Sequence, residues 1–95
     1  QVMPDSIREM FWESCESSLA VLRQARRDGD VQQMLAELHS LRGMLGVYRM
    51  RGVSRKLIDA ENGLKCGAAS ALAEVDRLMA ELAAEINLAR TAAIA

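Results

Sequence analysis

Apolar residues recur along this chain at spacings of three and four, the period of an α-helix that buries one face. The clearest series lies in the middle of the chain and comprises Val31, Met34, Leu38, Leu41, Leu45 and Tyr48. A second such series near the C-terminus comprises Ala71, Val75, Leu78, Leu82, Ile86 and Ala89. Because no stretch alternates apolar and polar residues with a period of two, the pattern predicts helices and no half-buried strand.

Two further helices are predicted from series of the same spacing. The first should begin near Pro4, because proline is favoured in the first turn of a helix. Its inner face should hold Ile7, Phe11, Cys15, Leu19, Leu22 and Ala25, with Trp12 covering the edge of the core. Another helix, between the two clearest series, should bury Val53, Leu57, Ala60 and Leu64. The chain therefore holds four amphipathic helices in succession.

Short connections separate these helices. Gly29 is placed to end the first helix and Asp30 to cap the second, and residues 49–52 form the next predicted turn. Gly67 is expected to end the third helix, and Ser70 or a neighbour to begin the fourth. Four helices joined in this way predict an all-α fold, an antiparallel four-helix bundle of up-down topology, with or without a short extra N-terminal helix.

Length and charge narrow the class of protein. Ninety-five residues, 51% of them hydrophobic, suffice for one domain with its own core. We expect residues 5–90 to form that core and residues 91–95 to be a disordered tail. Twelve basic and 13 acidic residues give a net charge of −1, which does not favour nucleic-acid binding.

Targeting signals and cysteines indicate the compartment. No apolar run approaches the ~20 residues of a membrane span, and no signal peptide is recognisable. Cys15 and Cys66 fit no metal motif and are typical of reduced thiols. We therefore expect a cytoplasmic domain without membrane contact. The start at Gln1 and the Ala-rich end are typical of a piece of a longer chain.

Candidate chemistry centres on the single histidine, His39, which lies within the clearest helix. At 100° per residue its side chain points ~130° away from the apolar seam. Arg42, Gly43 and Gly46 follow it by three, four and seven residues and share its side of the helix. Glycine in a helix costs about 1 kcal/mol relative to alanine. Two glycines beside an imidazole therefore indicate a surface that is kept bare so that a large partner can reach the ring.

An exposed imidazole in this setting is suited to phosphoryl transfer. A neutral ring nitrogen is a nucleophile near pH 7 and can carry a phosphoryl group as a phosphoramidate. Such transfer needs in-line approach and neutralised phosphoryl oxygens rather than an elaborate pocket. Arg42, one turn beyond His39, is placed to supply that positive charge.

The segment His39-Ser40-Leu41-Arg42-Gly43 resembles the H-x-L-K-G signature of histidine-containing phosphotransfer (HPt) domains. These domains pass phosphoryl groups between receiver domains in phosphorelays. The resemblance, which extends over roughly residues 5 to 90, implies a helical bundle with His39 as the phospho-acceptor. Arg42 stands where the family usually has lysine, so that a planar fork replaces a point charge.

The resemblance also implies how the domain would work. Response-regulator receiver domains would dock over Leu35, Ser40, Gly43 and Gly46. The domain would need no cofactor of its own, since Mg²⁺ would come with the receiver, and it would have no kinase activity. It would be a monomer when isolated, acting alone or as the cytoplasmic part of a hybrid sensor kinase. Gly52 follows His39 by thirteen residues, three more than the family pattern, which predicts a longer second helix or a larger turn.

Two alternative functions remain open from the sequence. His39-Ser40-Leu41-Arg42 also resembles the H-E-L-R of the dimerisation helix in sensor kinases, although Ser40 and Met44 stand where that motif has an acid and a proline. That function would require a dimeric helical hairpin. The other alternative is a helical interaction module without chemistry.

Overall fold

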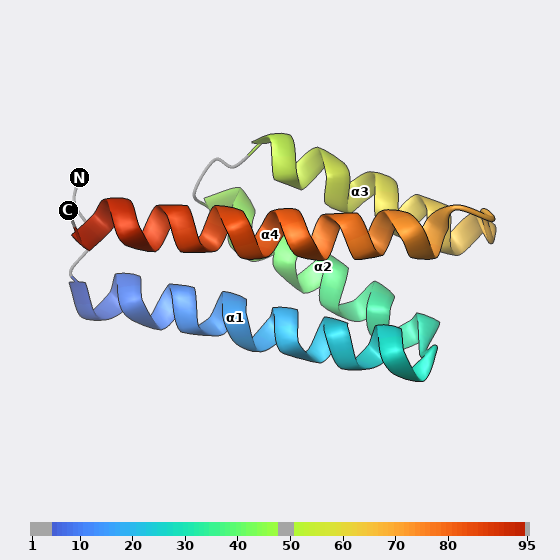
Figure 1. Ribbon diagram of the computed structural model, residues 1–95, viewed down its shortest axis with the longest axis horizontal. Coiled ribbons are helices and arrows are strands. Elements are labelled where there is room, and N and C mark those ends of the chain that lie inside the picture. The colour runs from blue at the N-terminus through green and yellow to red at the C-terminus, as the bar shows by residue number, and fades with distance from the viewer. Residues whose placement is uncertain (1–4, 48–50, 95) are drawn as a thin grey trace.

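A computed structural model describes residues 5–47 and 51–94, and these residues form four α-helices and no strand. The helices are α1 (Asp5–Asp28), α2 (Val31–Val47), α3 (Arg51–Cys66) and α4 (Ala71–Ile94). Consecutive helices run in opposite directions, and the first turn of α1 and the last turn of α4 lie at the same end (Figure 1). Both α1 and α3 pack against α2 and against α4. The predicted antiparallel four-helix bundle is therefore confirmed, and the residues before Asp5, where a short extra helix was allowed for, lie outside the described part.

All four helices contribute their predicted seams to one hydrophobic core. The α2 seam is completely buried at Met34, Leu38, Leu41 and Leu45. Facing it are buried residues of the other helices, namely Cys15, Leu19, Leu22, Ala25, Leu57, Ala60, Leu64, Ala71, Val75, Leu78, Met79, Leu82 and Ile86. The central residues of both of the clearest seams are therefore buried within one chain, in a bundle of four helices. This arrangement argues against the dimeric hairpin of a sensor kinase.

Three predictions about the core require correction or fall outside the described residues. Trp12 is buried and Phe11 is only partly buried, the reverse of what the sequence predicted. The two rings contact each other edge to face, with their centroids 4.8 Å apart. Val31 is exposed, because it is the first residue of α2 and lies where the chain turns at the end of the bundle. Tyr48, Pro4 and the side chains of Ile7 and Ala89 lie outside the described part.

The predicted glycine stops are confirmed by their backbone geometry. Gly29 and Gly67 have φ angles of 70° and 69°, in the left-handed region that favours glycine. After α1, the N–H of Asp30 donates to the carbonyl of Ala25 at 2.9 Å, which closes the helix end in the Schellman pattern. Asp30 then caps α2, since its Oδ1 accepts the N–H of Gln33 at 3.1 Å.

Two predicted irregular segments are helical instead. Arg51 and Gly52 were expected in the turn before the third helix, yet α3 begins at Arg51; a glycine is tolerated there because first-turn N–H groups have no intrahelical acceptor. The remaining turn, residues 48–50, lies outside the described residues. Residues 91–94, expected to be a disordered tail, continue α4. No helix breaker follows Ile86, and the Thr91 hydroxyl donates to the carbonyl of Asn87 at 2.8 Å.

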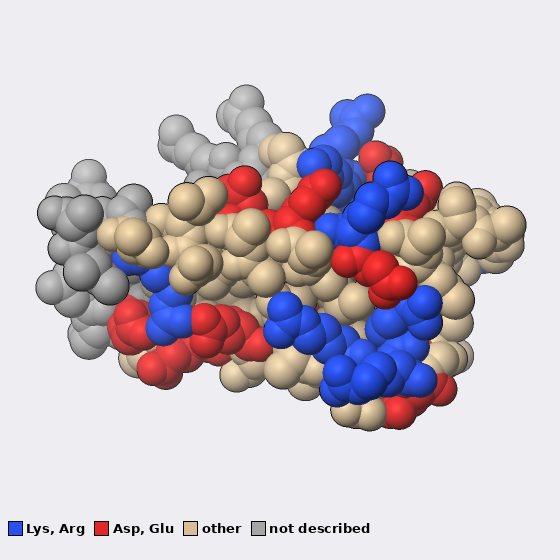
Figure 2. Space-filling model, viewed as in Figure 1, with Lys and Arg blue, Asp and Glu red and all other residues tan. Residues whose placement is uncertain are grey.

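The face formed by α1 and α4 carries side chains of both signs, with blue and red atoms next to one another at several places (Figure 2). Arg26 and Arg27 occupy the last turn of α1, where cations interact favourably with the helix dipole. Arg90 of α4 pairs with Glu9 and Glu16 of α1. Within the described residues, no helix combines the length and the apolar character that a membrane crossing requires.

Replacing Leu38 by alanine should lower the free energy of unfolding by about 3 kcal/mol, because it leaves a cavity in the packed core. Leu88→Ala is the matched control, since Leu88 lies on the exposed surface of α4 and should cost less than about 0.5 kcal/mol. Urea denaturation of the two variants measures both values. Equal losses would contradict the α2 seam as the centre of the core.

Candidate functional site

His39 lies in the middle of α2 and points away from the core. Its neighbours Leu38 and Leu41 are completely buried, while 70% of the imidazole side chain is exposed. The outward orientation predicted from the helical period is therefore confirmed. The ring is open to a partner molecule, and its position is set by the burial of the residues on either side of it.

Both polar contacts found for the ring among the described residues are made by Nδ1. The Nη2 atom of Arg42 lies 2.8 Å from Nδ1. A guanidinium has only donors, so at this distance Nδ1 accepts the hydrogen bond. The neutral imidazole therefore carries its proton on Nε2, the nitrogen that faces away from Arg42.

Glu61 contacts both His39 and Arg42, and sequence reasoning missed it as a candidate residue of this site. It lies on α3, and its side chain is only 6% exposed. Its Oε2 is 3.0 Å from Arg42 Nη1, and its Oε1 is 3.6 Å from His39 Nδ1. A buried carboxylate needs such a partner, because an unpaired buried charge is strongly destabilising. The structure thus brings together His39, Arg42 and Glu61 from two helices.

A signal for Glu61 is present in the sequence. Glu61 follows Leu57 by four residues and precedes Leu64 by three, so it occupies a position of the apolar seam of α3. An acid at a core position is informative because buried charges are rare unless they are paired. The pattern alone does not say which cation it meets, since Arg42 belongs to another helix.

The predicted docking residues surround the ring on the outer side of α2. Ser40, Gly43 and Gly46 are exposed, and Leu35 is partly buried against the core. A Cβ atom added at Gly43 or at Gly46 would meet nothing within 4 Å. The fold itself therefore does not require these glycines. Exposed Val31 extends the same surface by a further turn toward the start of α2.

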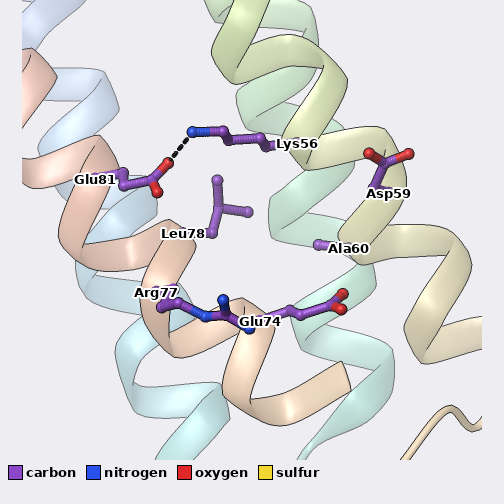
Figure 3. A pocket seen from close by; sticks show the side chains of 7 residues that line it. All are labelled: Lys56, Asp59, Ala60, Glu74, Arg77, Leu78 and Glu81. Carbon is purple, nitrogen blue, oxygen red and sulfur yellow. Dashed lines mark hydrogen bonds and ion pairs between the residues drawn. The ribbon is translucent and has the colours of Figure 1, made fainter. Parts of the chain in front are cut away.

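A shallow groove between α3 and α4 is separate from this site. Lys56 and Glu81 pair across it at 2.6 Å, and charged side chains of both helices surround Ala60 and Leu78 (Figure 3). None of His39, Arg42 and Glu61 lines this groove. The imidazole is presented on a convex helix surface rather than in a pocket.

The described residues include no group of three or more His, Cys, Asp or Glu side chains that could hold a metal ion. The two thiols differ sharply. Burial, followed by the neighbouring Glu16 charge, raises the pKa of Cys15 to about 11, whereas Cys66 is exposed. Neither lies in the cluster of His39, Arg42 and Glu61.

Comparison with known protein families matches residues 6–92 to the Hpt domain. This match covers nearly the whole chain and includes all three residues of the cluster. No curated protein and no solved structure gives a significant match.

Replacing Arg42 by alanine should cost about 3 kcal/mol of unfolding free energy, because it leaves the buried Glu61 carboxylate without its ion-pair partner. Arg26→Ala is a matched control, since Arg26 is 32% exposed, much like Arg42 at 34%, and pairs with an acid on another helix. Its partner Asp76 is half exposed, so that loss should stay below about 1 kcal/mol. Chemical denaturation measures both free energies of unfolding. Similar losses in the two variants would show that burial of Glu61 does not strengthen the contribution of its ion pair to stability.

Proposed function

This chain belongs to the Hpt domain family, and on that premise we propose that His39 accepts a phosphoryl group from a receiver-domain aspartate and passes it to another receiver. Hpt domains carry phosphoryl groups on histidine in phosphorelays, with receiver domains as their partners. The observation that carries the assignment to His39 is its exposure. It is the only histidine of the sequence, and 70% of its side chain faces solvent.

The two ring nitrogens of His39 have different roles in the proposed reaction. Nε2 attacks the phosphorus in line, so that an N–P bond forms while the O–P bond to the aspartate breaks and the aspartate leaves as a carboxylate. In the tautomer that attacks, the ring proton is on Nδ1. The ring becomes positive as the Nε2 lone pair is donated, and the Nδ1–H group then needs an acceptor. Glu61 supports this role, because its Oε1 faces Nδ1 from 3.6 Å and its burial holds it in place.

Charge on the transferring phosphoryl group is neutralised from two sources in this proposal. Arg42 supplies one cation, and a planar guanidinium can hold two phosphoryl oxygens at once. Mg²⁺ supplies the other and arrives with the receiver domain. Arg42 is bound at the Nδ1 edge of the ring in the free domain, so this role requires the guanidinium to move toward Nε2.

The receiver docks on the outer surface of α2 in this proposal. Gly43 and Gly46 let its backbone approach the helix, and Ser40 and Leu35 supply polar and apolar contacts beside the ring. Open space at both glycines supports this arrangement, because neither has a packing role within the bundle. Each glycine lowers the stability of the helix by about 1 kcal/mol relative to alanine. In this proposal, that loss is offset by the space it leaves for the partner to approach.

The domain acts as a cytoplasmic monomer in this proposal, alone or as part of a hybrid sensor kinase. The self-contained core supports the monomer, since every described helix contributes buried residues to one core within the chain. Receiver partners support the cytoplasmic setting. The domain supplies a nucleophile and a docking surface, while autokinase activity belongs to another part of the relay.

Replacing His39 by glutamine should abolish phosphorylation by phosphorylated receivers, because no other imidazole is present. The free energy of unfolding of the variant should lie within about 0.5 kcal/mol of the value for the parent protein, since the side chain is exposed. Radiolabelled transfer followed by acid and base treatment of the product measures the first effect, and denaturation measures the second. Acid-labile label on the variant would refute His39 as the acceptor.

Replacing Gly43 by leucine should obstruct docking and lower the rate of transfer from a receiver by about tenfold or more, the equivalent of about 1.4 kcal/mol. Phosphorylation by the small donor phosphoramidate should stay near the parent rate, because the ring itself remains open. Ala80→Leu on the exposed surface of α4 is the matched control and should leave both rates unchanged. Full receiver transfer by the Gly43 variant would contradict the bare-surface hypothesis.

A further inference from the structure

The hydrogen bond between Arg42 and His39 is at odds with a reactive ring in the free domain. At 2.8 Å the guanidinium donates into the Nδ1 lone pair, because arginine has no acceptor. In the neutral imidazole the proton then sits on Nε2. A nitrogen that bears a proton has no free lone pair in the plane of the ring, so the exposed Nε2 is not a nucleophile in this tautomer.

Glu61 favours the opposite tautomer. Its carboxylate faces Nδ1 from 3.6 Å and could accept a hydrogen bond from a protonated Nδ1 after a small shift. In the free domain that carboxylate is already engaged, since Arg42 Nη1 holds its other oxygen at 3.0 Å. The Arg42 guanidinium thus donates both to Nδ1 of His39 and to Glu61. Without it, Nδ1 and the Glu61 carboxylate could form a hydrogen bond with each other.

We propose that Arg42 is a positioning residue that holds His39 in the unreactive tautomer until a phosphoryl group draws the guanidinium away, after which Glu61 stabilises the reactive one. This inference deepens the function proposed above and rests on it. The Nε2 proton leaves to water and a proton from water binds Nδ1, so the net charge of the ring does not change. The lone pair thereby freed on Nε2 forms the N–P bond as the O–P bond of the donor breaks.

The geometry allows Arg42 to leave while Glu61 stays. The Arg42 side chain is 34% exposed and lies one helical turn from the ring, whereas Glu61 is buried. A doubly charged phosphoryl group offers the guanidinium two oxygens at fork spacing, which replace both the imidazole nitrogen and the Glu61 oxygen that it gives up. The protonated Nδ1 then becomes the partner of Glu61. The motion is confined to one side chain and requires no change of the backbone.

Arginine is suited to this role in a way that lysine is not. Its rigid fork directs two N–H groups, Nη1 and Nη2, at Glu61 and at Nδ1 simultaneously. A lysine ammonium is a point charge and should settle on the carboxylate, its charged partner. Arg42→Lys therefore keeps a counterion for Glu61, which preserves the fold, and releases Nδ1.

The test is the tautomer of His39 in the free protein, measured from the ¹⁵N shifts of the two ring nitrogens at a pH where the imidazole is neutral. A single histidine makes the assignment unambiguous. We expect the parent protein to carry its proton on Nε2. Arg42→Lys and Arg42→Ala should move the ratio of the tautomers toward Nδ1–H by about tenfold or more, the effect of losing one charge-assisted hydrogen bond. Arg26→Ala should leave the ratio unchanged.

A parent protein with its proton on Nδ1 would overturn the proposal without any variant. An unchanged ratio of the two His39 tautomers in Arg42→Lys would also overturn the proposal, because this variant is expected to fold. Phosphorylation by phosphoramidate supplies a second readout, since the parent protein should then show a protonated Nδ1. The tautomer is measured without a receiver, so a failure of receiver transfer would remove the proposed function while leaving the assignment of Arg42 to be judged on its own result.

Discussion

Burial of the α2 seam is the constraint on which the rest of the site depends. Met34, Leu38, Leu41 and Leu45 are completely buried, and this sets the rotation of the helix about its axis. A rotation that exposed these leucines would cost several kcal/mol of hydrophobic free energy. His39 therefore faces solvent as a consequence of packing behind it, and the exposed glycines one and two turns on share its side of the helix.

The same rotation places Arg42 at the boundary between core and solvent, where it reaches a buried acid on the next helix. Glu61 is costly to bury and is retained beside the ring at 3.6 Å. In the proposed reaction this acid offers Nδ1 an acceptor when the ring becomes positive.

Reactivity in this bundle depends on small differences between competing hydrogen bonds. In the free domain Arg42 donates to the ring and to Glu61 at the same time, and in the proposal a phosphoryl group replaces both, which changes the protonation of Nε2. Because the cluster lies on two rigid helices, only the side chain of Arg42 has to move. The His39 side chain is 70% exposed, so in the proposal a receiver domain supplies the other wall of the site and excludes water.

The sequence by itself determined the four helices, their core faces, the stops at Gly29 and Gly67 and the outward orientation of His39, because helical periodicity and turn chemistry are local properties. The resemblance carried by residues 39–43 also pointed to the family that the match over residues 6–92 shows. The sequence predicted Val31 to be buried and residues 91–94 to belong to a disordered tail. Both predictions were wrong because local sequence patterns do not indicate where the packed part of a bundle ends. Only the tertiary structure decided that Glu61 meets Arg42 and His39, since those residues are 19 and 22 positions away from it and come together only when α2 packs against α3.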